Sequence, residues 1–86
     1  MKTSVDISYY PLKEEFKPSI KDFILRLRLH NNIVVKTNGM STQVFGEYIE
    51  VMEILTKEIQ CSFEIPHSVF ILKIINADLQ ALPNLN

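Results

Sequence analysis

The sequence predicts an α+β domain in which four strands form one antiparallel sheet and two helices cover one of its faces. Two segments have helical periodicity, and four short runs rich in β-branched and aromatic residues flank them in the order strand, helix, strand, strand, helix, strand. Between the second and third runs stands Asn38-Gly39, a strong short-range signal for a tight hairpin. Right-handed crossovers would place both helices on the same face, so we expect a ferredoxin-like βαββαβ sandwich that spans residues 1–86 as one domain.

The first half of the chain should contain one strand and one helix. Apolar and polar side chains alternate over residues 5–10, which indicates a strand that Pro11 ends. The first helix should begin near Pro18, because proline is tolerated in the first helical turn. Its apolar stripe repeats at i, i+3, i+4 and i+7 and consists of Ile20, Phe23, Ile24 and Leu27.

The second half should contain a hairpin, a helix and a last strand. Strands are predicted over residues 33–38 and 40–45, joined by a type I′ turn that needs positive φ at both central positions, and Gly46 should end the second of them. A helix is predicted over residues 47–64. Its inward stripe is Tyr48, Val51, Met52, Leu55, Ile59, Ser62 and Phe63. Pro66 separates it from a strand over residues 69–75, and the tail, residues 78–86, either packs as an extra turn or frays.

Size and composition favour a homo-oligomer. A chain of 86 residues buries only about 60% of its unfolded surface, so small domains usually add disulfides, a metal or a partner subunit. The single Cys61 excludes an intrachain disulfide, and His30, Cys61 and His67 are too scattered for a zinc site. The strand at 69–75 is apolar on both faces, which predicts a dimer or tetramer built through helix-free sheet faces or strand edges.

Charge and hydropathy argue against other macromolecular partners. Nine Lys and Arg stand against ten Asp and Glu, and this balance lacks the basic stripe of a nucleic-acid-binding protein. The longest apolar run, residues 69–75, is interrupted by Lys73 and is far shorter than the ~20 residues that span a bilayer. The N-terminal residues lack the pattern of a secretion signal. We therefore expect no nucleic-acid partner, no membrane partner and a cytoplasmic location.

No motif in the sequence points to catalysis. A Gly-rich phosphate loop, a GxSxG elbow and an HExxH motif are all missing from the sequence. Cys61 is expected to be a small buried or half-buried residue rather than a nucleophile, and His67 has no obvious orienting partner in the sequence. We therefore expect no enzyme activity, no catalytic residues, no metal ligands and no cofactor.

Three segments of the chain resemble the thiamine-binding, YkoF-like family. They are Ile7 to Leu12, Phe23 to Leu27 and, most specifically, Met40 to Tyr48, in which a Met-x-Thr pair is followed by Gly and an acidic residue at the start of a helix. The family commonly has Pro before that Met, where this chain has Gly39. The resemblance covers residues 5 to about 78. It implies a ferredoxin-like fold, oligomers built through the sheets, and binding of thiamine or its hydroxymethylpyrimidine moiety without turnover.

Nine residues are candidate ligand contacts. A pyrimidine needs a flat apolar slot and a few fixed donors and acceptors, and a thiazolium cation favours an aromatic face. The candidates are Ser8, Tyr10, Asn38, Met40, Ser41, Thr42, Gln43, Phe45 and Glu47. Each also has a structural interpretation: Phe45 as core, for example, and Glu47 as a cap and dipole partner of the second helix. Thr42 and Gln43 lie on opposite faces of one strand, so they cannot both point into one intrachain pocket.

Other functions remain as alternatives to ligand binding. The strongest is a regulatory or protein-interaction module of the same fold with no thiamine ligand, because this fold hosts many functions. RNA binding is disfavoured since the central strands lack the aromatic and basic signature of an RNA-recognition motif. A weak enzyme acting on a thiamine precursor is disfavoured because no acid–base pair is recognisable.

Overall fold

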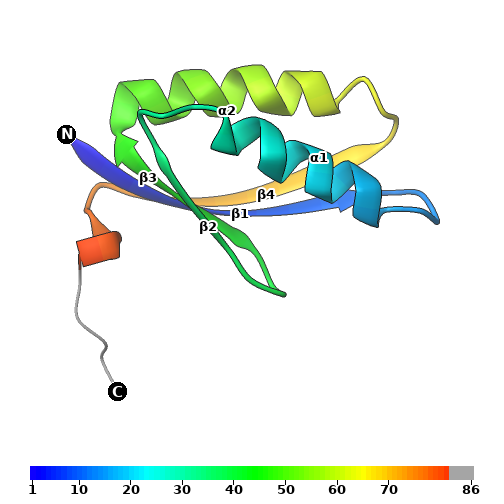
Figure 1. The fold of residues 1–86 in the computed structure, drawn as a ribbon, viewed down its shortest axis with the longest axis horizontal. Coiled ribbons are helices and arrows are strands. Elements are labelled where there is room, and N and C mark those ends of the chain that lie inside the picture. The colour runs from blue at the N-terminus through cyan, green and yellow to red at the C-terminus, as the bar shows by residue number, and fades with distance from the viewer. Residues whose placement is uncertain (82–86) are drawn as a thin grey trace.

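A computed structural model describes residues 1–81, in which two helices cover one face of a four-stranded sheet (Figure 1). The elements are β1 (Lys2–Pro11), α1 (Lys17–Arg28), β2 (Val34–Thr37), β3 (Thr42–Glu47), α2 (Tyr48–Ser62), β4 (Ser68–Ile75) and the 3-10 turn η1 (Leu79–Ala81). This βαββαβ order confirms the predicted ferredoxin-like α+β fold. Residues 82–86 of the predicted tail lie outside the described residues.

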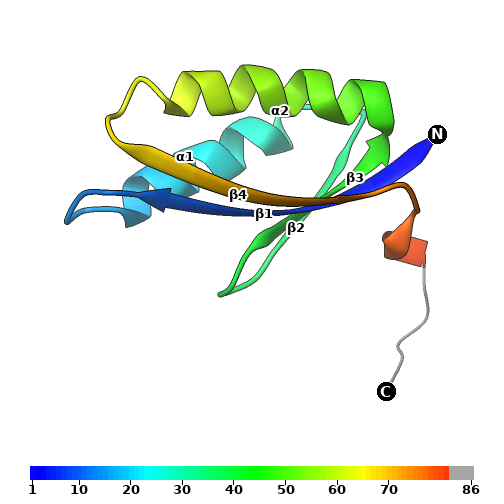
Figure 2. The same cartoon turned by 180° about the vertical axis from the view of Figure 1, so that it is seen from behind.

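The sheet has the strand order β2-β3-β1-β4, and every neighbouring pair is antiparallel. β1 lies in the centre and pairs with both β3 and β4, as in Val5↔Val44 and Val5↔Ile74. β2 and β4 are therefore the edge strands. Both views show α1 and α2 on one side of the sheet and η1 on the other (Figures 1 and 2). Within residues 1–81, the face that η1 lies on carries no α-helix, and it is here called the helix-free face.

The core lies between the sheet and the helices. Val5, Ile7 and Tyr9 of β1 are buried, because alternate residues of a strand point to the same face. The Tyr9 ring stacks on Phe70 with centroids 4.2 Å apart and meets Phe23 edge-on at 5.6 Å. Both arrangements are favourable for aromatic pairs, which bury large apolar areas. These contacts fasten α1 and β4 to the central strand.

The helical stripes match the prediction on α1 and depart from it on α2. On α1, Phe23 and Leu27 are buried, and Ile20 packs against the core. On α2 the stripe also takes in Ile54 and Glu58, both buried, whereas Phe63 is 54% exposed. Glu58 is buried because Arg26 reaches across from α1 and contacts it. In a sequence, an acidic residue on a helix indicates the solvent-exposed face, because a carboxylate is rarely buried without a partner of opposite charge.

The β2–β3 hairpin is confirmed, but its turn differs from the predicted type I′ geometry. No residue in the described part of the chain has a positive φ. The loop spans residues 38–41, where Asn38 donates its N–H to the carbonyl of Ser41 at 3.1 Å. Asn38 Oδ1 accepts the N–H groups of Met40 at 2.8 Å and Ser41 at 3.1 Å. An Asn side chain thus holds the turn, which is why positive φ is not required. β3 begins at Thr42 and runs through Gly46, which therefore does not end it.

Candidate functional site

The candidate ligand contacts gather mainly where the β2–β3 hairpin diverges from β1. β3 pairs with β1 only as far as Ile7↔Thr42, whereas β1 continues to Pro11 with β4 on its other side. The divergence leaves a cavity of about 120 Å³, here called the hairpin cavity. It is lined by β1 residues 7–10, hairpin residues 37–42, and Ile20, Phe23 and Ile24 of α1. Six of the nine predicted contacts therefore line one cavity: Ser8, Tyr10, Asn38, Met40, Ser41 and Thr42.

The backbone of Tyr9 faces the open edge of β1 inside this cavity. Leu12 donates its N–H to the carbonyl of His67 at 2.8 Å, on the β4 side. Backbone groups of successive residues alternate in direction along an antiparallel strand, so the N–H and C=O of Tyr9 point toward the β3 side. The same alternation is seen at the start of β1, where Tyr48, which follows β3, donates its N–H to the carbonyl of Met1 at 2.8 Å. Met1 and Tyr9 are an even number of residues apart, so their backbone groups point to the same side. No strand among residues 1–81 covers β1 at this position, so Tyr9 offers a donor and an acceptor side by side.

Most of the polar hairpin side chains are engaged in shaping the cavity. Asn38 closes the turn, and the hydroxyls of Thr37 and Thr42 are 3.0 Å apart. Ser41 Oγ donates to a carboxylate oxygen of Asp6 at 2.6 Å. The bond from Ser41 to Asp6 holds the hairpin in position relative to β1. Ser8 and Tyr10 have side chains on the helix-free side of β1 and line the cavity from there.

Gln43 and Phe45 lie outside the hairpin cavity. They face the helix-free side of β3, whereas Thr42 faces the helices, so the prediction that Thr42 and Gln43 occupy opposite faces is correct. Gln43 and Phe45 line a second cavity of about 350 Å³, here called the sheet cavity, together with Ser4, Val5, Asp6, Lys73, Ile74, Ile75 and Leu79. The nine predicted contacts therefore do not form one intrachain site.

Asp6 is the polar centre of the sheet cavity. Its Oδ1 accepts hydrogen bonds from Ser41 Oγ at 2.6 Å and Gln43 Nε2 at 2.9 Å. These bonds lower the pKa of Asp6 below its ordinary value, with help from the charge of Lys73, although partial burial opposes the shift. Asp6 therefore stays ionised. It links the hairpin to the central strand from the helix-free face.

Glu47 lies at the opposite end of β3 from the hairpin and lines neither cavity. It is the N-cap residue of α2, but its side chain makes no capping hydrogen bond, so the predicted capping role is wrong. Its carboxylate instead accepts a hydrogen bond from the N-terminal ammonium of Met1 at 3.0 Å and lies 3.4 Å from Lys2 Nζ. These contacts lower the pKa of Glu47. Pairing in the sheet, which brings Lys2 opposite Glu47, causes this arrangement.

Three further predictions concern metal ligands, a membrane partner and the burial of Cys61. Residues 1–81 contain no group of three or more His, Cys, Asp or Glu that could hold a metal ion. In the same range no helix is long and apolar enough to cross a membrane. Cys61 is exposed, so the prediction of a buried or half-buried residue is wrong.

The comparisons with known proteins support the fold. No family model and no curated protein matches the sequence. Among solved structures, the chain is similar to a Streptococcus pneumoniae protein with a TM-score of 0.84 and 20% identity, covering 95% of this chain and 93% of that one. It is also similar to a Thermotoga maritima protein proposed to act in thiamine biosynthesis or salvage, with a TM-score of 0.81 and 20% identity, covering 90% of this chain and 85% of that one.

A Bacillus cereus domain of unknown function, DUF77, gives a TM-score of 0.69 at 15% identity, with 92% of this chain and 79% of that chain covered. The fold and the hairpin cavity thus define a small ferredoxin-like α+β protein with a ring-sized cavity beside its central strand. At identities of 20% and 15%, the similarity to these structures shows a shared fold.

Proposed function

We propose that this protein binds thiamine or its hydroxymethylpyrimidine moiety without turnover, with the pyrimidine ring in the hairpin cavity. The observation that carries the proposal is the N–H and C=O of Tyr9, which lie on the open edge of β1 inside that cavity. An aminopyrimidine presents a ring nitrogen that accepts a hydrogen bond next to an amino group that donates one. The ring therefore complements the strand edge as a neighbouring strand would.

The size and lining of the hairpin cavity support a single aromatic ring. Its volume of about 120 Å³ is close to the ~150 Å³ of an apolar protein cavity that holds benzene. Ile20, Phe23 and Ile24 supply apolar surface from α1, and the strand supplies the polar groups. A site of this kind, largely apolar with a few fixed donors and acceptors, is typical of small-molecule binding. The role in thiamine biosynthesis or salvage that has been proposed for the similar Thermotoga maritima protein adds support.

We further propose that the protein acts as a homo-oligomer, a dimer or tetramer, in the cytoplasm. β4 is an edge strand, and Val69, Ile71 and Ile75 on its helix-free side are 40%, 56% and 43% exposed. An exposed apolar edge strand favours pairing with another chain. Burial of the helix-free face or of this edge would cover these side chains. The exposed free Cys61 suits a reducing compartment.

Titration calorimetry and thermal-shift measurements with thiamine, hydroxymethylpyrimidine and unrelated metabolites test the binding proposal. We expect the first two to stabilise the protein by mass action. Ile24→Trp should fill the hairpin cavity and weaken binding about tenfold or more, equivalent to about 1.4 kcal/mol.

The matched control is Leu29→Trp, which adds the same ring just beyond the end of α1 at a site that is 84% exposed and lines neither cavity. It should leave the affinity unchanged. Circular dichroism checks that both variants fold. Absence of heat and of stabilisation with millimolar thiamine and hydroxymethylpyrimidine would favour the alternative, an interaction module without a thiamine ligand. Unchanged affinity in a folded Ile24→Trp variant would place the ligand elsewhere.

A further inference from the structure

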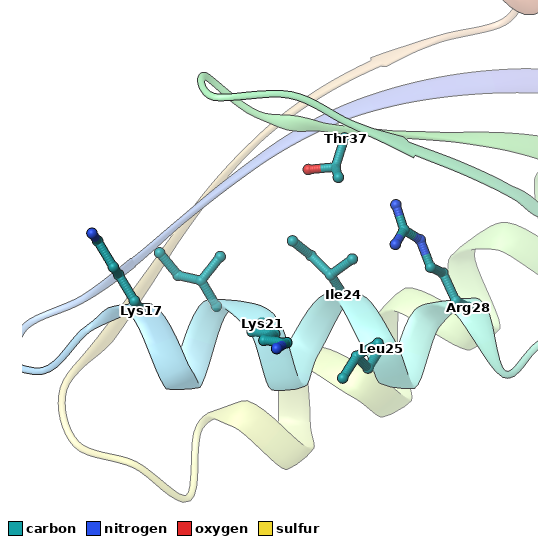
Figure 3. A pocket seen from close by; sticks show the side chains of 7 residues that line it. Lys17, Lys21, Ile24, Leu25, Arg28 and Thr37 are labelled. Carbon is teal, nitrogen blue, oxygen red and sulfur yellow. The ribbon is translucent and has the colours of Figure 1, made fainter.

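A basic groove runs along the flank of α1 that faces β2 (Figure 3). Its volume is about 300 Å³, and Lys17, Lys21 and Arg28 line it together with an apolar floor and the Thr37 side chain of β2. Figure 3 shows the Arg28 and Ile24 side chains directed from the helix toward Thr37. The residues that line the groove include no carboxylate.

The three cations of the groove have no ionic partner within the described part of the chain. Arg26, the other basic residue of α1, pairs with Asp22 and Glu58, whereas Lys17, Lys21 and Arg28 have no carboxylate oxygen within 4.0 Å in residues 1–81. Lys17 also stands in the first turn of α1, which has no acidic residue, although a helix N-terminus favours negative charge. Lys17 therefore does not stabilise the helix, whereas Arg28 in the last turn complements the helix dipole.

The spacing of the cations places them on one line. Residues four and eleven positions apart in a helix fall within about 40° of one another around its axis, since each residue turns by roughly 100°. Lys17 and Arg28 are separated by roughly 16 Å along α1 at about 1.5 Å per residue. The groove therefore presents three positive charges in a stripe along one flank of α1.

The basic groove adjoins the hairpin cavity. Ile20, Ile24 and Thr37 line both, so a substituent on a ring in the cavity would lie close to the groove. A phosphate group carries a charge of about −1.5 to −2 at neutral pH and accepts several charge-assisted hydrogen bonds. The thiazolium ring of thiamine is a cation, and the same stripe would repel it.

We propose that the ligand of this site is a phosphorylated aminopyrimidine, whose ring occupies the hairpin cavity and whose phosphate or diphosphate lies among Lys17, Lys21 and Arg28. The inference rests on the proposed function and adds the class of ligand that the site selects. A phosphate ester of hydroxymethylpyrimidine is then preferred over both the free alcohol and thiamine.

Calorimetry with hydroxymethylpyrimidine, its monophosphate ester and thiamine tests the preference at low and moderate ionic strength. We expect the ester to bind about tenfold or more tightly than the alcohol, with an advantage that shrinks as salt is added. In Lys21→Gln and Arg28→Gln the ester should lose most of this advantage, while the affinity for the alcohol stays the same.

Lys57→Gln is the matched control, because it removes one positive charge from an exposed position of α2 that lies outside the basic groove. It should leave the ester's advantage intact. Equal affinity for ester and alcohol would overturn this inference and leave the proposed function standing. If the ester still bound about tenfold more tightly than the alcohol in both Lys21→Gln and Arg28→Gln, the inference would also be overturned, since the phosphate would then be bound elsewhere. Failure of all three probes to bind would count against the proposed function itself.

Discussion

At the scale of single residues, the most consequential side chain that sequence patterns missed is Glu58. Its Oε1 accepts a hydrogen bond from Arg26 Nη1 at 2.8 Å, and its Oε2 lies 2.8 Å from His30 Nε2. Arg26 also donates to the carbonyl oxygen of Glu58 at 2.9 Å and to Ser62 Oγ. Burial by itself would raise the pKa of Glu58, but the hydrogen bonds from His30 and Arg26 outweigh burial and lower it. The cluster joins α1 to α2 with its charges paired.

Glu58→Gln is expected to lower the free energy of unfolding by about 2 kcal/mol at neutral pH. The variant keeps the shape of the side chain but removes the charge that Arg26 requires, and hydrogen bonds to charged groups contribute roughly 1.5–3 kcal/mol. Urea denaturation provides the measurement. Glu53→Gln, at an exposed position of the same helix, should cost under about 0.5 kcal/mol. An equally small loss in the free energy of unfolding for Glu58→Gln would mean that the cluster adds no net stability.

The stabilisation by Glu58 should also depend on pH in a defined direction. Because the folded-state pKa lies below the ordinary value of 4.5, the contribution is fully present above that value and is lost as the pH falls through the folded pKa. The difference in stability between the wild type and Glu58→Gln should therefore shrink as the pH is lowered below this ordinary value. A difference that grows on acidification would contradict this assignment.

At the scale of elements, Gly46 allows the end of β3 to pack closely against α2 and the loop before β2. A Cβ at this position would lie 3.1 Å from Val51 Cγ2, 3.4 Å from the carbonyl oxygen of Asn32 and 3.4 Å from Ile33 Cγ2. The 3.1 Å distance is shorter than most real Cβ contacts, the 3.4 Å distances are at the lower limit of ordinary van der Waals contact, and Val51 and Ile33 are buried. A methyl group at residue 46 would therefore require Val51 to shift by a few tenths of an ångström.

Gly46→Ala should therefore destabilise the protein by about 1–2 kcal/mol, within the range for adding a methyl group to a packed site. Gly39 is the internal control, since a Cβ there meets nothing within 4 Å and its φ is not positive. Gly39→Ala should change stability by less than about 1 kcal/mol, in the stabilising direction, because it restricts the unfolded chain. Thermal and urea unfolding of both variants measure the contrast. Equal effects of the two substitutions would refute the close-packing explanation.

At the scale of the whole molecule, the two faces of the sheet differ in how they meet solvent. The helix-facing side is closed by α1 and α2, whereas η1 is the one element of residues 1–81 that lies on the other side (Figures 1 and 2). There the sheet cavity combines the ionised Asp6 with apolar side chains, Phe45 and Ile75 among them. An apolar surface with a polar centre is suited to self-association, and the polar centre would determine the register of the two copies.

Ile71→Lys should dissociate the proposed oligomer. Ile71 is 56% exposed on the helix-free side of β4, where a buried lysine in an interface would be costly. Ile49→Lys is the control, because Ile49 is 63% exposed but belongs to α2 on the other side of the sheet. Light scattering at micromolar concentrations should give an oligomer for the wild type and Ile49→Lys and a monomer for Ile71→Lys. A monomeric wild type, or an Ile71→Lys variant of unchanged mass, would refute the proposal.

The sequence by itself determined the order of the elements, the fold class and the region of the hairpin cavity. These follow from local signals: the repeat of Phe23 and Leu27 on α1, the alternation of Val5, Ile7 and Tyr9 on β1, and the Asn38-Gly39 turn. Residues that are close in sequence within one such element, for example within one hairpin, stay close in space in the fold. For this reason four of the candidate contacts, Asn38, Met40, Ser41 and Thr42, line one cavity together.

Only the tertiary structure decided how far each strand pairs and which charges meet. Pairing of β1 with β3 ends at Ile7↔Thr42, so it leaves the backbone of Tyr9 on an open edge, and it carries Glu47 to the far end of the sheet. The crossing of α1 and α2 buries Glu58 against Arg26 and leaves Lys17 and Lys21 along the basic groove. The physical reason is that register and helix packing depend on contacts between residues distant in sequence, whereas periodicity reports only each segment's own preference.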